Sequence, residues 1–438
     1  MGKDRKPNTP KLWTPVFVVI IALTFCCFVM GQGLNSGTSV FLTGKGYGAA
    51  LPGTLALVFS FAAAGTRLLI GPIIDGGKCS LVILVGIAVL VAGTLLSAFV
   101  EGIPLFTISR LLQGAGFAAA TTAAATAAAN VLPAERLGEG IGYHGLGQAL
   151  AMSVGPAFAL FLVGTDPASN LYVGLALVGV AGFAIALGAR YERHPERLPE
   201  SSAFRRQWER GRSESEACEP GRPAASPSAS PEPDGTAQPA RPAQSPLAGL
   251  FSIFEPRALP GAIPMTILCP TFGFGIFFAG LYGTTLGYAN AGLFYTISAV
   301  TMIAVRLLSK RFMDTVPAIK TFTVAVAFGV IGFVMLFFAA ESEALFLASG
   351  LFYGLVLGIS LPLNQSVAVK NTPPERWGAT NALFLLFNDL GIGLASAIWG
   401  AVNDAFGFQF SILAVIACQL LAYVAAWVFY PADQKRWR

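Results

Sequence analysis

Arg110 and Asp389 lie deep inside long apolar stretches of this sequence, where charged side chains are rare. A charge in such surroundings is costly unless it meets a partner or water, so each is a candidate functional residue. Asp389 is the one acidic residue in the middle of any apolar stretch, and removal from water raises the affinity of a carboxylate for a proton. We therefore expect Asp389 to load and release a proton, with Arg110 as its counter-charge or as a contact for an anion. The competing interpretations are an Asp389 that pairs permanently with a neighbouring helix and a structural Arg110 that is satisfied by carbonyls or extends outward to the interface.

Neutral polar side chains within the apolar stretches form a second group of candidates, suited to line a cavity for a solute. Gln32 and Ser36 are four residues apart and share one helical face, with Asn35 close to that face. Packing or hydrogen bonding between helices is the competing interpretation for any one of them. The candidates are Gln32, Asn35, Ser36, Gln113, Gln148, Tyr282, Tyr353 and Asn388.

The composition places these residues in a polytopic membrane protein. Of 438 residues, 54% are hydrophobic and 12% are charged, and the mean hydropathy is +0.65. The apolar stretches are continuous rather than alternating, and each is close to the roughly 20 residues that a spanning helix needs, so we predict an all-α fold. The twelve predicted spans are approximately 14–36, 47–70, 79–99, 103–131, 138–164, 170–189, 258–282, 285–308, 317–339, 344–368, 378–402 and 408–430.

A polar segment, residues 190–257, separates the first six spans from the last six. It is rich in Pro, Ser, Ala and balanced charge, which predicts a disordered tether, with a regulatory or partner-binding segment as the alternative. The predicted organisation is a tail (1–13), a six-helix bundle (14–189), this linker, a second six-helix bundle (258–430) and a second tail (431–438).

Charge placement predicts the orientation of the chain and excludes several functions. Lys and Arg concentrate in the tails, the linker and alternate loops, which predicts that both termini face the cytoplasm, in the inner membrane of a bacterium. The net charge of +5 fits loops that meet an anionic leaflet, so no nucleic-acid partner is expected. We find no phosphate loop, no nucleophile motif and no metal-ligand spacing of the six cysteines, so we expect neither an enzyme nor a metal or other cofactor.

The two halves are related by an internal repeat with an offset of about 240 residues. The pattern Arg67-x3-Gly71-x3-Asp75 recurs with Arg306 and Asp314 at its ends. These residues lie at the ends of the second and eighth spans and are candidates for conformational gating. The arrangement is a parallel repeat of six spans, which places a substrate site near the midplane between the halves.

The same offset pairs further residues and exposes one asymmetry. Gly114 falls on Gly354, whereas Asn388 and Asp389 fall on Gln148 and Ala149. One half therefore carries a titratable group where the other carries a neutral amide.

The chain resembles the major facilitator superfamily over essentially its whole length. Arg110-x2-Gln113-Gly114-x-Gly116 is similar to the R-x-x-Q-G-x-G pattern of this family. The loop from Gly71 to Ser80 is similar to its G-x-x-x-D-R-x-G-R-R signature, although several of the basic positions are replaced.

Two further motifs resemble members of the superfamily that export their substrates. Gly155-Pro156 resembles the core of an antiporter signature and allows a helix bend, which makes both residues gating candidates. The stretch from Phe387 to Gly393 resembles bacterial arabinose-efflux-type permeases.

The resemblance implies a secondary transporter in which two six-helix bundles alternate access to a midplane site. We expect export of a small organic solute, driven by exchange for protons, by a monomer in a lipid bilayer. A proton symporter or uniporter for a sugar, nucleoside or organic anion is the alternative, and a non-transporting sensor or scaffold is the alternative of another class.

Overall fold

The computed structural model describes residues 11–75, 78–99, 102–133, 136–164, 169–217, 255–313, 316–372 and 377–430. In these residues the first half forms six long helices. Thr14 caps the first of them through its Oγ1, which accepts a hydrogen bond from the Phe17 amide at 3.2 Å. The six helices are α1 (Pro15–Gly44), α2 (Ala50–Asp75), α3 (Cys79–Phe99), α4 (Ile103–Val131), α5 (Leu137–Val163) and α6 (Asn170–Ala186).

The second half repeats this plan. Its first span is built from three consecutive pieces, because a π-helical turn interrupts the α-helix in its middle. The spans are α9 (Leu259–Phe274) with η6 (Gly275–Ala279) and α10 (Gly280–Thr285), then α11 (Leu293–Met313), α12 (Ala318–Phe337), α13 (Glu343–Lys370), α14 (Trp377–Phe406) and α15 (Phe408–Phe429).

The observed helices confirm the predicted all-α membrane fold. Ten helical segments of the described residues are long and apolar enough to cross a membrane. The remaining two predicted spans correspond to α4, which is rich in Ala and Thr, and to α11, which has a shorter apolar segment, Leu293–Arg306. The eighth span begins later than predicted, because turns around Gly287, whose φ is +81°, precede α11.

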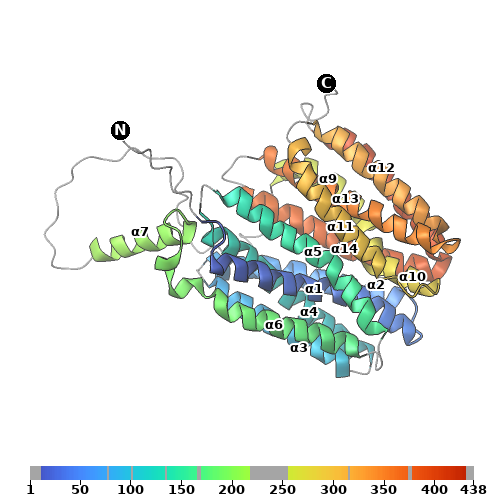
Figure 1. Cartoon of the computed structure of the whole chain (residues 1–438), viewed down its shortest axis with the longest axis horizontal. Coiled ribbons are helices and arrows are strands. Elements are labelled where there is room, and N and C mark those ends of the chain that lie inside the picture. The colour runs from blue at the N-terminus through green and yellow to red at the C-terminus, as the bar shows by residue number, and fades with distance from the viewer. Residues whose placement is uncertain are drawn as a thin grey trace, which may run out of the picture.

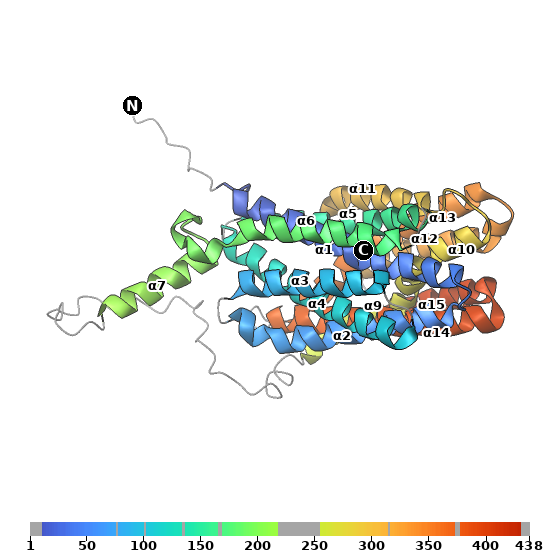
Figure 2. The ribbon, with the colours of Figure 1, turned by 90° about the horizontal axis from the view of Figure 1, so that it is seen from below.

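The two halves form adjacent bundles, shown in blue to green and in yellow to red in Figures 1 and 2. Across the seam between them, α2 packs along α14 and α5 packs along α11, and α1 contacts η6 and α10. We call the end of the molecule that carries α7 the linker end, and the opposite end, where α10 lies in Figure 1, the far end.

The predicted disorder of the linker is wrong for its first part. Residues 190–202 dock on the linker ends of α3 and α4, and α7 (Ala203–Ala217) projects away from the bundles (Figure 1). Tyr191 is buried and accepts a hydrogen bond from Asn130, while Glu192 accepts one from the amide of Ser80 at the start of α3. These contacts supply the buried surface that composition alone did not reveal. The remainder of the predicted linker, from residue 218 to 254, lies outside the described residues.

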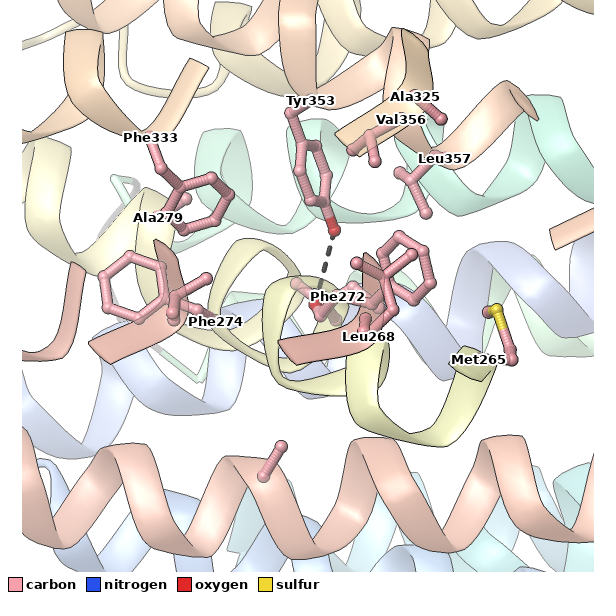
Figure 3. Close-up of a cluster of buried hydrophobic side chains, with 14 of the residues drawn as sticks. Met265, Leu268, Phe272, Phe274, Ala279, Ala325, Phe333, Tyr353, Val356 and Leu357 are labelled. Atoms are coloured by element: carbon pink, nitrogen blue, oxygen red, sulfur yellow. Dashed lines mark hydrogen bonds between the residues drawn. The ribbon is translucent and has the colours of Figure 1, made fainter. Parts of the chain in front are cut away.

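The core of the second bundle is apolar and aromatic. Figure 3 shows Tyr353 of α13 pointing toward α9, where its hydroxyl donates a hydrogen bond to the Phe272 carbonyl at 3.3 Å. Phe274, Phe333 and Leu357 surround this contact within the same buried cluster. Tyr353, predicted to line a cavity, therefore packs in the interior of one bundle.

Repeat-related glycines bring helices together in both bundles. A Cβ atom added to Gly114 of α4 would collide with the Phe59 carbonyl of α2. A Cβ atom added to Gly354 of α13 would collide with the Ser298 carbonyl of α11, and Phe59 and Ser298 are themselves separated by the repeat offset. Small residues at these crossings allow the close backbone approach on which helix association in a membrane depends.

We therefore expect Gly114→Ala and Gly354→Ala each to destabilise the protein by about 1–3 kcal/mol, because a methyl group must be forced between two backbones. The apparent melting temperature in one detergent measures the effect. Gly65→Ala on α2 is the matched control, since no heavy atom lies within 4 Å of the added Cβ. Equal melting temperatures for all three variants would contradict this account of the crossings.

Candidate functional site

An ion pair between Arg67 and Asp389 joins the two bundles in the middle of the seam. The Arg67 Nε donates to the Asp389 Oδ2 at 2.9 Å, and the Arg67 Nη1 donates to the Thr122 Oγ1 of α4 at 2.8 Å. The side chains of Arg67 and Asp389 are 19% and 24% exposed. The pair is thus partly buried between the two bundles.

Glycines on α14 place Asp389 at this position. A Cβ atom on Gly391 would lie 3.0 Å from the Cβ of Cys269 on α9, and Gly393 lies against Ser60 on α2. The Cys269 thiol also contacts the side-chain oxygen of Asn388 at 3.6 Å. The motif around Asp389 therefore lets α14 approach a helix of its own bundle on one side and α2 on the other.

Arg110 does not contact Asp389, which pairs with Arg67 instead, and its contacts fit the alternative of a structural arginine. Its side chain is 1% exposed inside the first bundle, where Nη2 donates to the Asn35 Oδ1 at 2.7 Å and Nη1 donates to the Gln113 Oε1 at 3.0 Å. Its Nε donates to the Leu55 carbonyl at 3.3 Å, and the guanidinium lies 4.8 Å from the centre of the Phe59 ring. Neutral acceptors and a ring face thus satisfy Arg110, which gives it a role within one bundle.

The Arg110 network also accounts for two predicted cavity residues. Asn35 and Gln113 are buried as partners of Arg110, and the Gln113 amide further donates to the Gly93 carbonyl and the Ser97 hydroxyl of α3. Both side chains are therefore engaged within the first bundle rather than facing a solute.

The other predicted cavity residues are divided between buried and half-buried positions. Gln32 is buried beside Gly155, and Tyr282 packs on Phe408. Gln148 and Asn388 are half-buried. Gln148 and Asn388 are thus the predicted cavity residues that are not fully buried, and they are repeat-related.

Gln148 also contacts His144, whose two ring nitrogens both have partners. Thr24 donates its hydroxyl proton to the Ile20 carbonyl at 2.7 Å, so its oxygen is free to accept from the His144 Nε2 at 3.3 Å. The Gln148 amide then faces the unprotonated Nδ1 at 3.4 Å. This arrangement suits a neutral histidine that positions Gln148.

The predicted gating residues fall into different environments. The Arg306 Nη1 donates to the Gly145 carbonyl across the seam at 3.1 Å, linking α11 to α5. A Cβ atom on Gly155 would lie 2.6 Å from the Val29 carbonyl, so Gly155-Pro156 allows α5 to approach α1 within one bundle. Gly71 and Asp75 lie in the last turns of α2, and Asp314 lies outside the described residues.

Tyr295 closes the seam near the far end and was not identified from the sequence. Its hydroxyl donates toward the carbonyls of Gly275 and Ile276 and accepts from the Gly280 amide, which are backbone groups that the π-helical turn exposes. The hydroxyl also accepts a hydrogen bond from Ser36 of α1 at 3.3 Å. The residues around Tyr295 in the sequence form no pattern that indicates this role.

Comparisons with known proteins agree with the architecture described above. A model of the Major Facilitator Superfamily matches residues 20–391 and, in an overlapping match, residues 291–437. The staphylopine export protein of Staphylococcus aureus (strain Mu50 / ATCC 700699) is 29% identical over 169 residues, which are 38% of this chain and 42% of that protein. An uncharacterized MFS-type transporter of Burkholderia mallei (strain SAVP1) is 28% identical over 152 residues, or 35% of this chain and 37% of that protein. These matches span less than half of each relative.

Solved structures share the fold at low sequence identity. A point mutant of the nucleoside transporter NupG superposes with a TM-score of 0.69 at 12% identity, covering 95% of this chain and 100% of that chain. The xylose transporter XylE from E. coli, in a partially occluded inward open conformation, gives a TM-score of 0.68 at 14% identity, covering 97% and 99%.

A double-mutant cycle tests the pairing of Arg67 with Asp389. We expect the stability changes of Arg67→Ala and Asp389→Ala to be coupled by about 1–3 kcal/mol, because each removes the partner of the other. Denaturant unfolding in one detergent gives the four stabilities. Arg110→Lys combined with Asp389→Ala is the control, and the stability changes of these two substitutions should add to within about 0.5 kcal/mol. Additivity in the first cycle would contradict the ion pair.

Proposed function

Because this chain belongs to the Major Facilitator Superfamily and therefore moves a small solute across a membrane rather than catalysing a reaction, we propose that it is a proton-coupled exporter. Two six-helix bundles would alternate access to a site near the midplane. The observation that supports this proposal is the partly exposed ion pair between Arg67 and Asp389 at the seam.

The ion pair offers a direct link between protonation and movement of the bundles. An ionised Asp389 attracts Arg67 across the seam and holds α14 against α2. A protonated Asp389 loses that attraction, while Arg67 keeps its charge at any pH of interest. Proton uptake would thus lower the cost of separating the two helices, and proton release would restore the contact.

The direction of transport and the sidedness of the molecule complete the proposal. With basic residues on the cytoplasmic side, the linker end faces the cytoplasm of a bacterial inner membrane, and the far end faces outward. The similarity to a staphylopine export protein favours export. We expect the chain to act as a monomer.

Symport of an organic anion is a second candidate, and one observation favours it. A cationic solute that approached Asp389 would meet the fixed charge of Arg67 2.9 Å away. An anionic solute would instead find Arg67 available once Asp389 is protonated, so anion and proton would travel together. The sign of the solute charge therefore decides between exchange and symport at this site.

The coupling role of Asp389 is tested in proteoliposomes, with a solute first identified by thermal-shift screening of the purified protein. Asp389→Asn should abolish accumulation driven by a pH gradient while leaving exchange of labelled for unlabelled solute, because the neutral amide cannot release a proton. Glu343→Gln at the start of α13 is the matched carboxylate control and should transport like the wild type.

The direction of the pH gradient that supports accumulation separates the two candidates. Accumulation of solute inside the vesicles while protons flow outward indicates exchange, and accumulation while protons flow inward indicates symport. Unchanged pH dependence of transport in Asp389→Asn would remove Asp389 from the mechanism.

A further inference from the structure

Asp404, near the end of α14, contacts the start of α2 across the seam at the far end. Its Oδ1 accepts a hydrogen bond from the Ala49 amide at 2.6 Å, and its Oδ2 accepts one from the Ala50 amide at 2.7 Å. Both bonds are short and involve an ionisable acceptor, as in strong charge-assisted pairs. A side chain of the second bundle thus binds the backbone of the first.

The start of α2 contains no capping side chain of its own. The Ala49 carbonyl accepts the first helical bond, from Gly53 at 3.2 Å, so Ala49 occupies the cap position. Neither Gly48 nor Ala49 has a side-chain acceptor, and Pro52 has no N–H to be satisfied. By contrast, Ser342 caps α13 from within the same bundle. The carboxylate of Asp404 therefore replaces the missing cap and also favours the positive end of the helix dipole.

The backbones around this contact fit together closely. A Cβ atom on Gly48 would lie 2.5 Å from the Asp404 Oδ2, and a Cβ atom on Gly400 would lie 2.5 Å from the Ala49 carbonyl oxygen. The Ser396 hydroxyl, which donates to the Gly393 carbonyl of its own helix at 2.6 Å, also lies 3.2 Å from the Gly53 carbonyl. The seam between α2 and α14 is thus continuous from Asp404 toward Asp389.

We propose that Asp404 is a latch that holds the far end of the transporter closed. Opening the far end requires α14 to move away from α2, which leaves two amides at the start of α2 without their acceptor. The latch therefore biases the two bundles toward the conformation with a closed far end. This proposal rests on alternating access, but it requires neither proton coupling nor a particular solute.

Hydrogen–deuterium exchange of the full chain in lipid nanodiscs tests the latch without solute. Asp404→Ala removes both acceptor atoms, and Asp404→Asn keeps one oxygen but loses the charge. We expect the amides at the start of α2 to exchange about tenfold faster in Asp404→Ala than in the wild type, equivalent to about 1.4 kcal/mol. The exchange rate in Asp404→Asn should lie between those of Asp404→Ala and the wild type. The increase should include residues 31–43 and 290–300, which carry the Ser36–Tyr295 contact, and not only the start of α2.

Two further variants separate a latch from a local helix cap. Gly48→Ala keeps the carboxylate but displaces it, so it should reproduce the faster exchange at the Ser36–Tyr295 contact. Ser342→Ala removes a cap at the same end within one bundle, so its effect should stay at the start of α13. If Asp404→Ala and Gly48→Ala speed exchange only in residues 47–56, or nowhere, the latch is rejected. Proton-driven transport by Asp389 would be unaffected by that result.

Discussion

An arginine keeps its charge at any depth in a membrane, so each buried guanidinium must find acceptors within the protein. Three arginines of this chain meet that requirement in three ways. Arg110 is enclosed by neutral acceptors and a ring inside one bundle, and it thereby fixes how α1, α2 and α4 pack. Arg67 and Arg306 reach across the seam and link the two bundles.

Arg67 and Arg306 occupy repeat-related positions, but their contacts across the seam differ in chemistry. Arg67 on α2 meets a carboxylate on α14, whereas Arg306 on α11 meets a backbone carbonyl on α5. A carbonyl accepts a hydrogen bond at every pH, while a carboxylate changes its charge. The Arg67–Asp389 contact therefore contains a group that can change its charge, whereas the hydrogen bond from Arg306 to the Gly145 carbonyl does not.

Hydropathy and the repeat were sufficient to predict the helices, because the membrane requires long apolar helices. They were not sufficient to predict which arginine faces Asp389. Arg67 and Arg110 both lie on helices of the first bundle, and only the rotation of each helix about its axis decides between them. The roles of Asp404 and Tyr295 were missed for a related reason, because most of their partners are backbone groups, which every residue type carries. The docked residues 190–202 show the same limit, because a polar composition does not exclude a few well-placed contacts.

Under the proposed proton exchange, the asymmetry of the repeat limits how steep a solute gradient the protein can maintain. Asp389 has Ala149 as its counterpart in the other half, so this site offers one titratable group per molecule. One proton per cycle crossing 100 mV releases about 2.3 kcal/mol. At about 1.4 kcal/mol for each factor of ten, an uncharged solute exchanged for that proton reaches a concentration ratio of roughly 50. In the proposed mechanism, the single titratable side chain at this site thus sets a thermodynamic ceiling on the work that each cycle performs.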